Sequence, residues 1–146
     1  MMADVTAGDE VRGHVARLQE AINDHDLEAL VDSFADDYTV EMPAHPRRAF
    51  AGREQVRRNW EQILAAVPDL SARIVGLISD GDTAWVEWDW RGTRVDGSPH
   101  HLRGVTIIGV RDGRIGWSRF FMEPVDIDGA AIDESIRESL AAGVKP

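Results

Sequence analysis

The spacing of apolar residues changes once along the chain, near residue 70, and this change constrains the fold more than any other feature. Before it, Val11, Val15 and Leu18 begin a stripe with spacings of three and four residues, which predicts an amphipathic helix. After it, extended runs alternate with turn signals, of which Asp112-Gly113 is the strongest predictor of a tight hairpin. Helices followed by a run of antiparallel strands predict an α+β fold rather than a parallel sheet.

Three helices are expected before residue 70. The first carries a stripe from Val11 to Ile22, the second begins at Asp26 and includes Phe34, and the third carries a stripe from Val56 to Val67. A short strand is expected between the second and third helices, over 38–42. The remaining predicted elements are four strands near 70–79, 83–94, 100–111 and 114–124, and a last helix near 130–141 with Gly143 beyond its end.

Charge and composition disfavour several classes of protein. The net charge is −10, whereas a nucleic-acid-binding domain usually carries a basic face. No apolar run approaches the roughly 20 residues that a membrane helix needs, and the N-terminus does not resemble a signal peptide. We therefore expect a soluble, cytoplasmic protein without a nucleic-acid or membrane partner. We expect one domain over 1–146, with a core at about 10–125 and a C-terminal helical extension at about 128–142.

Five short segments carry a resemblance to a known superfamily. They are Ala21–Leu30 (AINDHDLEAL), Phe34–Pro43 (FADDYTVEMP), Gly52–Trp60 (GREQVRRNW), Asp112–Ile115 (DGRI) and Arg119–Pro124 (RFFMEP). Their order and spacing resemble the nuclear transport factor 2-like superfamily, which includes SnoaL-like polyketide cyclases, ketosteroid isomerases and limonene-type epoxide hydrolases. The resemblance covers about 10–125. It implies a cone-shaped, curved antiparallel sheet that encloses a pocket with three N-terminal helices (a cystatin-like α+β barrel), and a homodimer packed through the sheet.

The catalytic positions of the ketosteroid isomerases carry side chains of a different chemical kind in this sequence. By the resemblance, the phenol position falls on Leu18 and the carboxylate base falls on Met42. The protonated acid falls near Val105 or Thr106. None of these side chains can transfer a proton as the isomerase requires, so ketosteroid isomerase activity is disfavoured.

Glu123 is the leading candidate for a catalytic residue. The resemblance to the epoxide hydrolases places it where their last carboxylate lies, but the region 99–103 lacks the paired Asp of their catalytic set. A SnoaL-like cyclase needs only one acid/base group in a shaped pocket, and this requirement fits best. We therefore predict that Glu123 transfers a proton, supported by Arg103 and His101.

The register of the last strand decides whether this prediction is possible. One alignment turns Phe120 and Met122 toward the pocket, and the other turns Phe121 and Glu123 toward it. The sequence leaves both open.

The chain contains five tryptophans, which is many for 146 residues. Some of them are expected to line a cavity that suits a flat hydrophobic ligand, although core filling explains most of them equally well. The predicted substrate-binding residues are Leu18, Met42, Trp60, Val86, Trp88, Trp90 and Phe121. We expect no cofactor and no metal, since the sequence has no cysteine and no closely spaced histidine pair of the kind that binds zinc.

Two functional hypotheses remain open, and the sequence does not decide whether the protein is an enzyme. The first is cofactor-independent acid/base catalysis, of the isomerase, cyclase or hydrolase type, on a small hydrophobic molecule. The second is a non-catalytic ligand-binding or dimerisation domain of the same fold. In a third, weaker hypothesis, tryptophans on the sheet form a surface for a partner protein.

Overall fold

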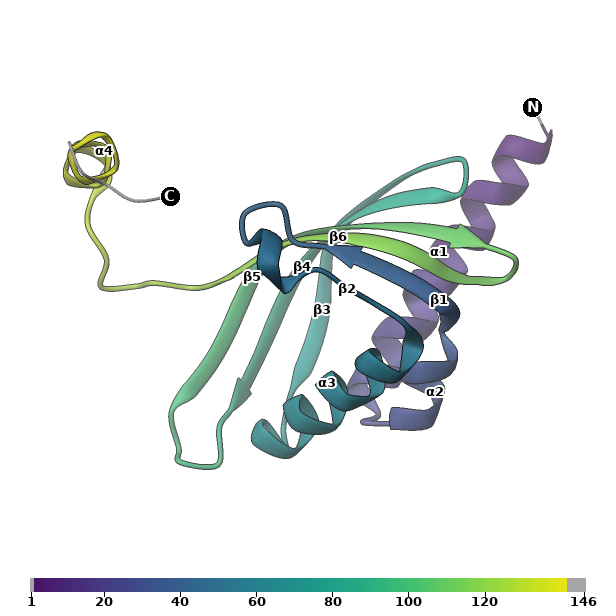
Figure 1. The fold of residues 1–146 in the computed structure, drawn as a ribbon, viewed down its shortest axis with the longest axis horizontal. Coiled ribbons are helices and arrows are strands. Elements are labelled where there is room, and N and C mark those ends of the chain that lie inside the picture. The colour runs from purple at the N-terminus through teal and green to yellow at the C-terminus, as the bar shows by residue number, and fades with distance from the viewer. Residues whose placement is uncertain (1, 142–146) are drawn as a thin grey trace.

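The fold centres on one curved sheet of six strands in the order β2-β1-β6-β5-β4-β3, seen in a computed structural model that describes residues 2–141 (Figure 1). The strands are β1 (Phe34–Glu41), β2 (Phe50–Ala51), β3 (Ser71–Asp80), β4 (Thr83–Thr93), β5 (Pro99–Arg111) and β6 (Arg114–Pro124). The helices are α1 (Met2–Asn23), α2 (Leu27–Asp32), α3 (Arg53–Ala66) and α4 (Ile132–Leu140), with a short 3-10 helix at Pro46–Arg48. The α+β fold class predicted from the sequence is confirmed.

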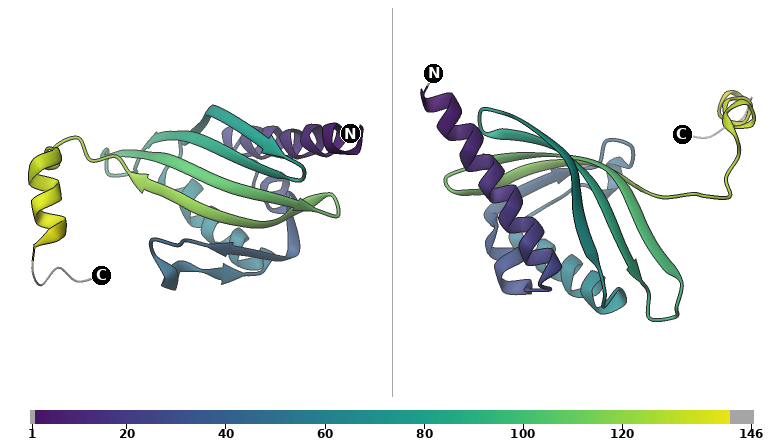
Figure 2. Two further views of the ribbon diagram at one scale, coloured as in Figure 1. Left: turned by 90° about the horizontal axis from the view of Figure 1, so that it is seen from above. Right: turned by 180° about the vertical axis from the view of Figure 1, so that it is seen from behind.

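The helices cover one face of the sheet. Helix α1 packs along β3, and α3 packs against β1. Seen from above, the strands lie in front of the helices, and α4 stands beyond the end of β6 (Figure 2). We call the helix-covered side the concave face and the opposite side the outer face. The sheet is antiparallel except between β1 and β6, which run parallel.

The second helix is shorter than the sequence predicts, and the prediction that it includes Phe34 is wrong. Asp26 caps the helix as expected, because its carboxylate accepts a hydrogen bond from the backbone N–H of Ala29 at 3.1 Å. At the other end the Ser33 hydroxyl donates to the Ala29 carbonyl, and α2 stops at Asp32. Phe34 then begins β1 and stacks edge-on against Tyr38, with ring centroids 4.7 Å apart. Aromatic pairing in the sheet therefore prevails over the helical spacing.

The hairpin between β5 and β6 forms as predicted. Asp112 and Gly113 both have positive φ, at 53° and 77°, as a two-residue turn of this twist requires. At the turn Arg111 pairs with Arg114, but the register shifts between Gly109 and Val110. The faces of the β6 side chains beyond this irregularity are therefore set by the pairing of β6 with β5 from Gly109 to Leu102.

The core lies between the concave face, α1 and α3. Trp88 is fully buried there, and its indole N–H donates to the Thr106 hydroxyl at 2.9 Å. Helix α4 is different, because its apolar stripe of Ile132, Ile136 and Leu140 is exposed. Gly143, expected beyond that helix, lies outside the described residues. Within 2–141, no helix combines the length and apolarity needed to cross a membrane.

Candidate functional site

An apolar pocket of about 120 Å³ lies between α3 and the concave face of the sheet. Its walls come from β1 and the segment after it, from α3, and from one residue each on β4 and β6. The lining residues are Phe34, Tyr38, Val40, Met42, Phe50, Val56, Asn59, Trp60, Ile63, Trp90 and Phe120. The pocket is thus a product of the sheet's curvature and of one helix laid across it.

Simple periodicity explains which residues reach this pocket. On α3, Val56, Asn59 and Ile63 follow at spacings of three and four and so share one helix face. On β1, Tyr38 and Val40 alternate with exposed residues and point to the same side. The side chains of α3 and those of β1 therefore line opposite sides of the pocket.

Four of the lining side chains carry a nitrogen or oxygen atom: Tyr38, Asn59, Trp60 and Trp90. Tyr38 is almost completely buried, and burial raises the pKa of its phenol although a hydrogen bond with Ser118 opposes the shift. The phenol therefore stays protonated at neutral pH. The described residues that line the pocket include no carboxylate and no imidazole, so the polar groups there can hold a ligand by hydrogen bonds but offer no ordinary acid/base pair.

The predicted substrate-binding residues divide into three groups. Met42, Trp60 and Trp90 line the pocket. Leu18, Val86 and Trp88 are instead packed in the core, at 7%, 0% and 0% exposure, because helix and strand neighbours close over them. The expectation for Phe121 is corrected: its side chain is 43% exposed, while Phe120 lines the pocket and Met122 packs against the core. The register of β6 is therefore the one that turns Phe120 and Met122 inward.

This register also places Glu123 away from the pocket. Glu123 is 55% exposed in its side chain, and its carboxylate lies 2.8 Å from Nε2 of His45. Arg103 lies opposite Glu123 in the β5–β6 ladder, but its guanidinium donates to Glu87 at 3.1 Å instead. The expected convergence of Glu123, Arg103 and His101 on one pocket is not observed.

Arg103 and His101 belong to a charged cluster on the outer face that is centred on Asp89. The Asp89 carboxylate accepts hydrogen bonds from Arg91 (3.1 Å), Arg73 (3.1 Å) and His101 (2.9 Å), and Arg103 approaches within 4.0 Å. The bonds from Arg91, then those from Arg73 and His101, hold the pKa of Asp89 well below its usual range, although desolvation opposes them. Asp89 is a permanent carboxylate that organises three arginines, and its oxygens are occupied.

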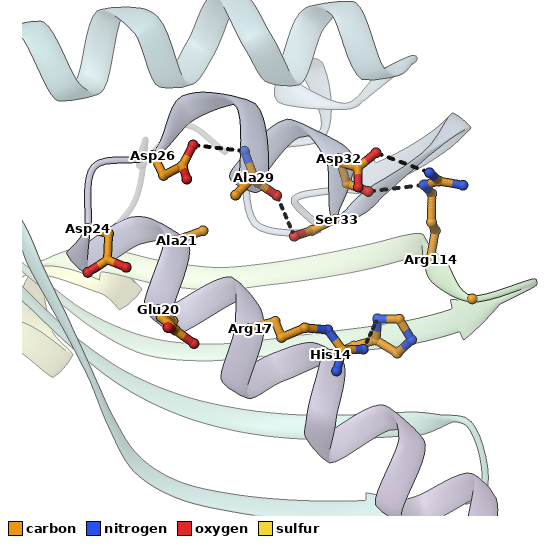
Figure 3. Close-up of a pocket in the computed structure, with 11 residues that line it drawn as sticks. His14, Arg17, Glu20, Ala21, Asp24, Asp26, Ala29, Asp32, Ser33 and Arg114 are labelled. Atoms are coloured by element: carbon orange, nitrogen blue, oxygen red, sulfur yellow. Dashed lines mark hydrogen bonds and ion pairs between the residues drawn. The ribbon is translucent and has the colours of Figure 1, made fainter.

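A second, larger hollow of about 490 Å³ lies between α1, α2 and the β5–β6 hairpin (Figure 3). Its wall contains His14, which is 8% exposed, and Arg17 donates to Nδ1 of His14 at 3.1 Å. Because a guanidinium can only donate, the proton of neutral His14 sits on Nε2, which faces Glu10 at 3.9 Å. Desolvation, helped by Arg17, lowers the pKa of His14. His14 thus has no free lone pair with which to act as a base.

Another charged pair in this hollow connects two elements of the fold. Arg114 donates to the carboxylate and to the carbonyl of Asp32, both at 3.0 Å, and so ties the hairpin to the end of α2 (Figure 3). Across residues 2–141, no group of three or more His, Asp or Glu is arranged to hold a metal ion. The apolar pocket is the better candidate for a ligand site.

The predicted substrate-binding set contains three of the eleven lining residues and misses the other eight, of which Tyr38, Phe50 and Asn59 are the most informative. Tyr38 has the same strand phase as Val40 and Met42, so alternation along β1 identifies it once Met42 is assigned to the pocket. Asn59 lies three residues after Val56 on the apolar stripe of α3, where a polar residue is unexpected. Phe50 lies on a two-residue strand after an irregular loop, and no local pattern identifies it.

The chain is similar to a known protein family and to several solved structures. Residues 15–116 match the SnoaL-like domain. No curated protein matches the chain. Among solved structures, the chain is similar to IdmH, a putative polyketide cyclase from Streptomyces antibioticus, with 26% identity, a TM-score of 0.67, and coverage of 77% of this chain and 91% of that one.

Two further structures share the fold. A putative ketosteroid isomerase from Kribbella flavida has 21% identity and a TM-score of 0.67, with 95% of this chain and 93% of that chain covered. An LEH-like epoxide hydrolase from M. tuberculosis has 16% identity and a TM-score of 0.69, with 80% and 84% covered. Proteins with different described functions therefore share this fold. The fold alone does not determine the function, so the function must be inferred from the pocket.

Proposed function

Because the chain belongs to the SnoaL-like domain family, we propose that it binds a small, largely apolar molecule in the pocket between α3 and the concave face. The observation that carries this proposal is the lining itself, which is apolar except for polar atoms of Tyr38, Asn59, Trp60 and Trp90. Concave, mostly apolar sites with a few polar groups are the usual form of a small-molecule site.

The size of the pocket limits what it can enclose. A cavity of roughly 150 Å³ in a protein core holds one benzene molecule, and the pocket here measures about 120 Å³. It is not sealed from solvent. The enclosed part of the ligand is therefore about one ring in size, and a longer molecule extends through the mouth.

A cyclase-type reaction is compatible with such a site. Holding a flexible chain in a folded conformation lowers the entropic part of a cyclisation barrier without any acid or base. The putative polyketide cyclase at 26% identity favours this class over hydrolysis. Proton transfer by Glu123, with Arg103 and His101 in support, stays a prediction; their positions on the outer face and at its rim do not favour it.

A cavity-filling pair of variants tests the proposal. Ile63→Trp places a large side chain in the pocket wall, while Ile78→Trp makes the same change on β3 at a residue that is 70% exposed. Calorimetric titration with acetophenone, a one-ring ketone, should show binding to the wild type and to Ile78→Trp. Binding should be lost in Ile63→Trp. Equal heats in all three proteins would refute the pocket as the binding site.

We also propose that two copies pair through the outer face. No helix within residues 2–141 covers this face (Figure 2). Cross-strand neighbours place apolar side chains side by side on it: Ile78 beside Trp85, and Trp85 beside Ile107. Trp85 and Phe121 are 42% and 43% exposed. Sedimentation should show a dimer that Trp85→Glu converts to a folded monomer; a wild-type monomer at high concentration would refute this pairing. The cytoplasmic location expected from the sequence stays a prediction.

A further inference from the structure

Three side chains on α3 are joined by hydrogen bonds in a chain that ends at the pocket wall. Arg58 donates from Nη2 to Oε1 of Gln55 at 2.6 Å, and Gln55 donates from Nε2 to Oδ1 of Asn59 at 2.8 Å. The residues are three and four positions apart, the spacings at which helical side chains meet. Of the three, Asn59 is the one that lines the apolar pocket.

The guanidinium of Arg58 fixes the direction of this chain. Side-chain amides can adopt two orientations, and their partners decide between them. Because Arg58 can only donate, Gln55 must present its oxygen to Arg58 and its N–H to Asn59. Asn59 must then present its oxygen to Gln55, which leaves the two N–H donors of Nδ2 without a partner among the described residues.

Other polar atoms in the wall agree with this direction. The indole N–H of Trp90 is buried and has no partner within the described part of the chain. The Tyr38 hydroxyl is engaged with Ser118. Among the described residues, the lining thus offers unused donors and, apart from the engaged oxygens of Tyr38 and Asn59 and the weakly accepting sulfur of Met42, no side-chain acceptor.

We propose that the pocket selects ligands that carry an oxygen acceptor, such as a ketone, ester or lactone carbonyl, and that Asn59 donates the selecting hydrogen bond. Gln55 is the positioning residue, since it acts only by orienting the Asn59 amide. This inference rests on the proposed function and adds the chemical class of the ligand. An alkene or arene of the same shape leaves the Asn59 donors desolvated and unpaired, which weakens its binding.

Two ligands of nearly equal shape measure this selectivity: acetophenone, with a carbonyl oxygen, and α-methylstyrene, with a methylene group in its place. The readout is the ratio of their two dissociation constants, compared between variants, so that their different hydration cancels. Asn59→Leu should reduce the preference for acetophenone about three- to tenfold, the value of one ordinary hydrogen bond.

Gln55→Glu is the sharper variant because it leaves the pocket lining unchanged. A carboxylate can accept from Arg58 but cannot donate to Asn59, so the Asn59 amide turns over and presents its oxygen to the pocket. The preference for acetophenone should fall at least as far as in Asn59→Leu. Gln62→Glu adds the same charge at an exposed position of α3 and should leave the wild-type ratio unchanged.

The outcomes separate this inference from the proposed function. If both ligands bind the wild type and the ratio is unchanged in Asn59→Leu and Gln55→Glu, the pocket is confirmed and the acceptor selectivity is wrong. If neither ligand binds the wild type, both the proposed function and this inference fail. A reduced ratio in Gln62→Glu as well would assign the effect to charge and overturn the role of Gln55.

Discussion

The two faces of the sheet differ in whether their polar groups have hydrogen-bond partners within the protein. On the concave face, the pocket wall is apolar and the Asn59 donors are left free. On the outer face, Asp89 is only 3% exposed, yet every hydrogen bond to its carboxylate from the described residues comes from a charged or ionisable side chain. The pocket therefore has hydrogen-bond donors that a ligand can use, whereas the Asp89 oxygens are already bonded to side chains of the protein.

This difference shows that a strongly shifted pKa is not by itself a sign of a functional site. Asp89 has the clearest carboxylate shift in the described chain, and its causes are bonds from Arg91, Arg73 and His101. Structural ion-pair networks shift pKa values just as active sites do. The pocket, which contains no such carboxylate, is still the place where a ligand can gain contacts and hydrogen bonds.

The largest difference in stability is expected when one tryptophan is removed from each face of β4 in turn. Trp88→Ala should lower the free energy of unfolding by about 3–5 kcal/mol, because it leaves a cavity and deprives Thr106 of its partner. Trp85→Ala, at 42% exposure, should cost less than about 1 kcal/mol in the isolated chain. Urea denaturation measures both. Equal losses would contradict the assignment of one face to the core and the other to the surface.

A smaller effect is expected at the centre of the charged cluster. Asp89→Asn should cost about 1–2 kcal/mol at pH 7, below the usual range for fully desolvated charged hydrogen bonds because Arg73 and Arg91 are mostly exposed. The folded-state pKa of Asp89 is lowered, so its contribution is present above its usual pKa near 3.8 and disappears as the pH falls further.

Unfolding curves at several pH values check the sign of this effect. Wild type and Asp89→Asn should differ at pH 7 and converge in acid. A difference that grows as the pH falls would mean that Asp89 is not stabilised as an anion in the folded state.

The smallest effect is expected for Glu123→Gln. Its contact with His45 joins two exposed side chains, and such surface pairs contribute about 0–1 kcal/mol. Acetophenone binding should be unchanged, since Glu123 does not line the pocket. A marked loss of binding or turnover in this variant would restore the catalytic role predicted from the sequence.

Much of the fold was predictable because it depends on local patterns. The helical stripe of α1, the period change near residue 70 and the Asp112-Gly113 turn are all local signals, and the structure confirms each. The boundary between α2 and β1 was not predictable in this way. Phe34 continues the spacing of a helix, whereas its pairing with Ile115 of β6 and its contact with Tyr38 show that it belongs to a strand.

The site was less predictable than the fold because it depends on a strand register. A shift of one residue exchanges Phe120 for Phe121 and moves Glu123 to the other face. Nothing local to β6 distinguishes the two registers; the pairing of β6 with β5 and β1 does. Likewise, the role of Asn59 depends on hydrogen bonds along α3 that a sequence pattern does not express.

The five tryptophans allow one direct test of the central claim, that ligands bind on the concave face and not at the charged cluster. Trp60 and Trp90 line the pocket, whereas Trp85 is exposed on the outer face. Each indole N–H gives a separate nitrogen–proton NMR signal during titration with acetophenone. The account predicts large shifts for Trp60 and Trp90 and almost none for Trp85. Shifts confined to Trp85 would contradict it.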